Sequence, residues 1–189
     1  MTAGVTEYVP EAFGEPCGPE DAFWSPGDGQ LDPGPIAARL TADLEEFAHL
    51  KMGEASVLFL MRSDEKLKAG RHVLGLMSLV RFQGDLGPVG EWMLARLCGG
   101  LPDYVMVLDA KWWAQAAPMQ REALVYHELL HAEHARGRDG ELRFTADGLP
   151  VWGIVGHDVE EFHKVAARYG AWSPDIQAFI GALQAGNAI

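Results

Sequence analysis

The sequence of 189 residues has few cysteines and few basic residues, and each shortage excludes a class of protein. Cys17 and Cys98 are isolated, so the chain contains neither a zinc ribbon nor a disulfide framework. Lysine and arginine total 15 against 27 acidic residues, which gives a net charge of −12 with no basic run. Because contacts to phosphate need clustered basic side chains, we expect no nucleic-acid partner. Isolated thiols are typical of a reducing compartment, so we expect a cytoplasmic protein.

The sequence also lacks long hydrophobic runs. No apolar run reaches the roughly 18 residues that a membrane helix requires, and the first residues, MTAGVTEYVPEAF, do not combine a basic start with an apolar stretch as a secretory signal does. We therefore expect no membrane partner. Hydrophobic residues at 48% and charged residues at 22% instead predict an ordinary globular domain.

Proline and glycine crowd residues 1–34, and such a segment disfavours helices and central strands. It nevertheless carries Tyr8, Phe13, Phe23 and Trp24. We predict an irregular N-terminal arm that lies over the domain, with a disordered tail as the alternative, followed by a single domain over residues 35–189.

Hydrophobic periodicity and turn residues predict the elements of that domain. The predicted helices cover 35–53, 88–98, 118–136, 157–169 and a last stretch from Pro174, which Ser173 caps. The predicted strands cover 55–62, 71–81 and 103–109, and a hairpin spans 142–152 around Asp147 and Gly148. This order predicts an α+β fold in which a small mixed or antiparallel sheet packs on the helix at 118–136.

That helix contains His127-Glu128-Leu129-Leu130-His131, an HExxH pentad. Helical winding puts positions i and i+4 on one face, so His127 and His131 can bind one metal ion, with Glu128 beside them as a general base. The surrounding residues are so apolar that the helix should be buried on all sides. Buried imidazoles and a buried carboxylate need partners, which a metal ion would provide.

A catalytic zinc site usually takes three protein ligands. His157, in the first turn of the next predicted helix, can point toward the HExxH helix, and Glu161 one turn later is the alternative. We predict His127, His131 and His157 as ligands of Zn²⁺. The remaining histidines, at positions 49, 72, 134 and 163, are interpreted as packing or surface residues.

HELLH, a short hairpin, HDVEEF and a helix ending in Tyr-Gly together resemble the metallopeptidases encoded by bacteriophages, as does AKWW after the strand at 103–109. More distantly, the spacing of His157 and Phe162 after HExxH resembles the SprT-like zinc proteases, although their C-terminal cysteine ribbon and basic surface are absent. The resemblance covers roughly residues 55–172. It implies a zincin-like fold, His157 as third ligand, a peptide or protein substrate and, for a phage protein, the host cytoplasm.

In this hypothesis Glu128 accepts a proton from the attacking water and passes it to the leaving amine. Arg143, Tyr169 and His163 are candidate donors to the oxyanion. We expect an extended peptide to add to the strand at 103–109 as to a sheet edge.

Two other functions remain open. Glu-x-x-His also occurs at Glu46 and Glu160, as in di-iron bundles, but the strand-rich middle of the chain does not fit four long helices. Alternatively, the chain is a zinc-binding phage regulatory or interaction module of zincin fold without turnover. Retention of Glu128 weighs against this second reading, because a structural site needs no general base.

Overall fold

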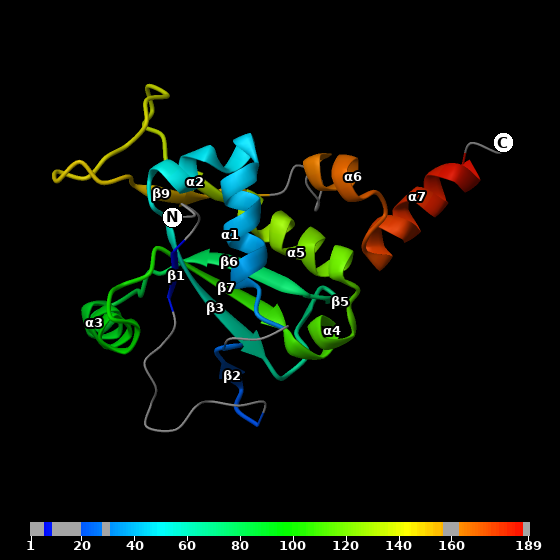
Figure 1. The fold of residues 1–189 in the computed structure, drawn as a ribbon, viewed down its shortest axis with the longest axis horizontal. Helices are drawn as coiled ribbons and strands as arrows, with labels where there is room; N and C mark the ends of the chain where they lie inside the picture. Colours follow the sequence, from blue (N-terminus) through cyan, green and yellow to red (C-terminus); the bar gives the residue numbers. More distant parts are fainter. Residues whose placement is uncertain (1–5, 9–19, 28–30, 157–162, 187–189) are drawn as a thin grey trace.

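The computed structural model describes residues 6–8, 20–27, 31–156 and 163–186 (Figure 1). Its main sheet is mixed and has the order β1-β3-β7-β6, with β2 paired to the other end of β3. β1 and β7 run parallel to β3, whereas β2 is antiparallel to β3 and β6 is antiparallel to β7. The strands are β1 (Thr6–Tyr8), β2 (Phe23–Trp24), β3 (Ser56–Arg62), β6 (Gly75–Leu79) and β7 (Tyr104–Asp109).

Two small two-stranded sheets accompany the main one. They pair β4 (Leu67–Lys68) with β5 (Arg71–His72), and β8 (Ala132–His134) with β9 (Trp152–Ile154). The helices are α1 (Gly34–Asp43), the 3₁₀ turn η1 (Glu45–Phe47), α2 (Ala48–Met52), α3 (Gly87–Cys98), α4 (Ala110–Gln115), α5 (Pro118–Leu130), α6 (His163–Tyr169) and α7 (Pro174–Gly186). The predicted α+β class is therefore confirmed.

β3 and β7 are the centre of the sheet, and both were predicted from the sequence. Their runs SVLFLMR and YVMVLD are rich in apolar and β-branched residues, which suits strands buried on both faces. α1 and α5 pack against each other and α5 also packs on β6, so the core lies between these helices and the sheet (Figure 1). No helix among the described residues is both long and apolar enough to cross a bilayer.

Three element boundaries differ from the sequence prediction. The helix predicted over 35–53 is interrupted at Leu44, whose backbone is extended, and the interruption lets Phe47 and Leu50 turn into the core. The strand predicted over 71–81 is divided into β5 and β6. The HExxH helix ends at Leu130 rather than near 136, because residues 132–134 pair with β9 as strand β8. Tertiary pairing overrides helical propensity there.

The N-terminal segment is not wholly irregular. Residues 6–8 and 23–24, which contain neither proline nor glycine, form β1 and β2 along one edge of β3. The prediction of an irregular arm is wrong for these five residues, since short proline-free stretches can still extend a sheet edge. The division between residues 34 and 35 stays a prediction.

The C-terminal helices follow the prediction in part. The Ser173 hydroxyl accepts a hydrogen bond from the Ile176 N–H at 3.3 Å, which confirms the predicted cap of α7. Helical spacing predicts Val159, Phe162, Ala166 and Tyr169 as the inward residues of the helix at 157–169, and the first two lie outside the described residues. Of the other two, Tyr169 packs against the core, whereas Ala166 is exposed and Val165 is buried in its place. In α7 the same spacing predicts that Phe179 faces inward, and it is exposed.

Candidate metal centre

The second half of α5 is surrounded by protein. Residues 123–129 are all buried, whereas Met119 in the first turn is exposed. His127 is 9% exposed and Glu128 is 4% exposed, so the expectation of a helix buried on all sides is confirmed for its second half and wrong for its first turn. The Glu128 carboxylate and the His127 imidazole are thus held where solvent cannot readily satisfy them and need specific partners, whereas His131 is partly exposed.

Val155 fixes the orientation of His131. The Val155 N–H donates a hydrogen bond to the His131 carbonyl at 2.8 Å, and His131 Nδ1 lies 2.7 Å from the Val155 carbonyl oxygen. A carbonyl only accepts, so Nδ1 carries the proton of the neutral ring, and Nε2 keeps its lone pair. Metal-bound histidines in proteins are usually oriented by such a hydrogen bond to a carbonyl.

His127 lies beside His131 and beside an aromatic wall. The two imidazole ring centroids are 5.3 Å apart with an interplanar angle of 70°, as expected for neighbours one helical turn apart. Trp172, which precedes α7, has its ring centroid 6.3 Å from that of His127 and packs edge-on against Trp112 of α4. Trp172 is buried, so these indoles form an apolar side of the site.

Glu128 reaches into space left by a glycine. A Cβ atom built on Gly75, the first residue of β6, would lie only 2.4 Å from Glu128 Oε1 and 2.9 Å from its Cδ. Any larger residue would therefore displace the carboxylate. α5 crosses the sheet so that its general-base candidate lies against the start of strand β6.

The donor set suits a divalent metal ion such as zinc: two imidazoles one helical turn apart, one of them oriented through Nδ1 by the Val155 carbonyl, and an adjacent buried carboxylate. The predicted third ligand, His157, and its alternative, Glu161, both lie outside the described residues. Within residues 6–8, 20–27, 31–156 and 163–186, no group of three or more His, Cys, Asp or Glu side chains is arranged to hold a metal ion.

The other described histidines have packing roles, as predicted. Nε2 of His49 lies 3.0 Å from the Ala132 carbonyl oxygen, and Nε2 of His72 lies 3.0 Å from Oδ2 of buried Asp109. His134 lies in β8 rather than in the predicted helix at 118–136, packs against Phe144 and Trp152, and places Nε2 2.7 Å from the Arg143 carbonyl oxygen. The side chain of His163 lies outside the part of the chain that is described.

A polar cluster on another face of α5 engages one predicted oxyanion donor. The Tyr169 hydroxyl donates to Glu122 Oε1 at 2.8 Å, and burial together with this carboxylate raises the pKa of Tyr169 to about 12. The Tyr126 hydroxyl donates to Glu46 Oε1 at 2.7 Å and holds the pKa of Glu46 below its usual value. Because the Tyr169 hydroxyl already donates its hydrogen bond to Glu122, Tyr169 is a weaker candidate for the oxyanion donor than the sequence indicated. Arg143 lies on the exposed hairpin after β8.

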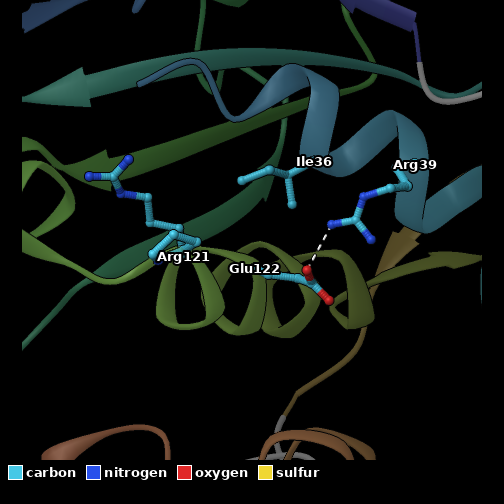
Figure 2. A pocket seen from close by; sticks show the side chains of 5 residues that line it. Ile36, Arg39, Arg121 and Glu122 are labelled. Carbon is cyan, nitrogen blue, oxygen red and sulfur yellow. Dashed lines mark hydrogen bonds and ion pairs between the residues drawn. The ribbon is translucent and has the colours of Figure 1, made fainter. Parts of the chain in front are cut away.

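A hollow of about 370 Å³ lies between α1 and the first half of α5 (Figure 2). Arg39 and Glu122 form a 2.7 Å ion pair across it, and Ile36, Pro118 and Arg121 complete its lining. Its lining contains no residue of the HExxH pentad, so we assign it no part in the chemistry of that site.

Sequence reasoning missed Gly75, Val155 and Trp172. A glycine inside a strand pattern is a recognised sign of close approach by another group, so Gly75 could have been noticed. Nothing local marks Val155 or Trp172, because their contacts to His131 and His127 are made across 24 and 45 positions of sequence.

Comparison with known proteins assigns the family. No curated protein and no solved structure matches this sequence. A family model described as "Putative phage metallopeptidase" matches residues 31–184, which include all of α1 to α6 and most of α7. The resemblance read from HELLH and HDVEEF is therefore confirmed, and the chain belongs to this phage metallopeptidase family.

Proposed function

We propose that this protein is a zinc-dependent peptidase in which His127, His131 and His157 hold the metal ion and Glu128 is the general base. The observation that carries the proposal is the placement of Glu128: its carboxylate is buried one residue from His127 and fits a space that only a glycine at position 75 leaves open. Membership of a metallopeptidase family supports the same chemistry.

When bound, zinc would polarise the peptide carbonyl and make the attacking water more acidic. The residues of the chain then have separate tasks. Val155 orients His131, Trp172 limits water on the His127 side, and Glu128 accepts the proton of the water and delivers it to the leaving amine.

The strand order bears on where an extended peptide could bind. β7 lies between β3 and β6, so the expectation that it is a sheet edge is wrong. In the described part of the chain the edge strand next to Glu128 is β6, which pairs only with β7. We propose that an extended peptide adds alongside β6, where backbone groups of the strand remain to pair with it.

The test compares wild type and Glu128→Gln, both loaded with zinc, on an unfolded protein substrate. We expect Glu128→Gln to bind zinc normally and to cleave 10²- to 10⁴-fold more slowly, the usual contribution of a general base. Equal rates in the two proteins would remove Glu128 from catalysis. Zinc binding without cleavage by wild type would instead support the regulatory module.

The third ligand is tested separately by the metal content of purified variants. We expect His157→Ala to lose most bound zinc and Glu161→Ala to retain it. The reverse result would make Glu161 the ligand, and full zinc content in both variants would refute the prediction that this segment supplies a ligand.

A further inference from the structure

α3 exposes an apolar face. Leu86 at its N-cap is 76% exposed, Trp92 is 64% exposed, and Val89 and Met93 are about half exposed. These four residues follow one another at spacings of three, three and one, so they lie on one side of the helix. A contiguous exposed patch of this kind usually marks an interaction surface.

Among the described residues, no other helix or strand packs extensively on this face. α3 lies apart from the α1–α5 layer at the rim of the molecule (Figure 1). Phe82 in the preceding loop lies against α3, and its ring is so near Gly90 that a Cβ there would lie 2.6 Å from the ring. Phe82 is itself half exposed and therefore widens the apolar patch.

Charges stand at the two ends of the patch and have opposite signs. Asp85 lies just before the N-cap, Arg96 lies in the last turn, and both are exposed. Positions 89, 92 and 96 fall on one side of the helix, and Asp85 lies beyond the N-cap at its other end, so the residues read acidic, apolar, apolar, basic from start to end. Asp85 and Arg96 stand at opposite ends of α3 and are too far apart to pair with each other.

We propose that this face binds a second copy of the chain, with the two α3 helices antiparallel about a twofold axis. In such an isologous contact, residue i meets residue j and j meets i. An axis between residues 90 and 91 brings Asp85 of one copy to Arg96 of the other twice, and Val89 to Trp92 twice. A parallel arrangement would instead place like charges together, and the charge pattern therefore selects the antiparallel dimer.

The chemistry of the face disfavours other occupants. A net charge of −12 repels an anionic membrane surface, a nucleic acid and also a second copy at long range, but the second copy offers the two compensating contacts between Asp85 and Arg96. The interface is small, with four large apolar side chains and Phe82 from each copy, so we expect a dissociation constant on the order of 10 µM. The proposal does not depend on metal binding or on peptidase activity, so either can fail without the other.

The first experiment is sedimentation equilibrium of the full-length chain at about 1–200 µM. We expect wild type to form a dimer and Trp92→Glu to weaken it on the order of 100-fold, because buried tryptophans dominate interfaces of this kind. The matched control is Leu149→Glu, which adds the same charge at a leucine that is 63% exposed on the distant hairpin. It should dimerise like wild type.

The second experiment tests the orientation by charge reversal. Asp85→Arg alone and Arg96→Asp alone should each weaken the dimer about five-fold, and the double variant should recover wild-type affinity, because the reversed pairs attract again.

A monomer at 200 µM overturns the proposal, as does a dimer that Leu149→Glu disrupts and Trp92→Glu does not. Binding of a monomer to neutral lipid vesicles through Trp92 would also overturn it, in favour of a membrane. Failure of the double variant to recover affinity would overturn the antiparallel arrangement.

Discussion

α3 and α5 are similar in sequence character and opposite in environment. Each carries a proline in its first turn, Pro88 or Pro118, and they contain 12 and 13 residues. α3 has only two charged residues, whereas α5 has three and also contains His127. By composition α3 should be the more buried helix, yet residues 123–129 of α5 are enclosed and α3 exposes Trp92. Whether a helix is buried thus depends on neighbours that the rest of the chain supplies, here β6 and α1 for α5.

The largest expected effect is the loss of stability when a buried side chain of α5 is truncated. Leu129 is fully buried beside Glu128, and Leu129→Ala should lower the free energy of unfolding by about 2–5 kcal/mol, since it removes packed methyl groups and leaves a cavity. Urea denaturation at about 1 µM protein measures it. A loss below about 1 kcal/mol would show that this part of α5 is not tightly packed.

The next largest effect is expected at Gly75, which makes room for the Glu128 carboxylate of α5. Gly75→Ala should lower kcat/KM about 100-fold while leaving the fold intact, because the new Cβ displaces the Glu128 carboxylate by a fraction of an ångström to an ångström. Peptidase assays with circular dichroism as a check on folding measure the effect. Gly181→Ala on α7, where nothing lies within 4 Å of the added atom, is the control. Full activity of Gly75→Ala would contradict the placement of Glu128.

A smaller effect is expected from the hydrogen bond that Tyr126 of α5 donates to Glu46. Tyr126→Phe removes the hydrogen bond to Glu46 and should cost about 1 kcal/mol at neutral pH. The Tyr126 hydroxyl lowers the pKa of Glu46 from its ordinary 4.5, so this stabilisation is present above that value and is lost as the pH falls through the lowered pKa.

Wild type and Tyr126→Phe should therefore converge in stability in acid, as thermal denaturation across pH can show. In a Glu46→Gln background, where the carboxyl cannot titrate, the cost of Tyr126→Phe should not change with pH. If the cost of Tyr126→Phe stays constant with pH in the wild-type background, the titration of Glu46 does not contribute to it.

The smallest expected effect is on α3. Val89→Ala should change the unfolding free energy by less than about 0.5 kcal/mol when measured at about 1 µM, where the proposed dimer is dissociated, because the side chain is half exposed and alanine favours helix. At 100 µM the same variant should become measurably less stable than wild type, since dimer formation adds to stability by mass action. A large loss at 1 µM would mean that α3 is packed within its own chain.

Local sequence signals were sufficient for much of the fold. β3 and β7 were found from their apolar runs, and α3 from Pro88 at its start and Gly99 at its end, where φ is +71°. The turn at Asp147 and Gly148 was likewise expected, and Gly148 has φ of +79°. These features depend on interactions within a few residues, which a sequence displays directly.

Boundaries set by distant partners were not predictable in the same way. The end of α5 depends on strand pairing between residues 132–134 and 152–154, and the break at Leu44 depends on where Phe47 and Leu50 meet the core. The position of β7 was also misjudged, because an apolar run does not say which strands will lie on either side of it.

The sequence by itself determined that His127 and Glu128 lie on a helix and that His131 follows one turn later at its end, because the 3.6-residue period is a property of the backbone. Only the tertiary structure decided that Val155 orients His131, that Gly75 makes room for Glu128, and that α3 rather than α5 faces solvent. Those outcomes come from packing between segments far apart in the chain, whose energies depend on which surfaces meet after the chain has folded.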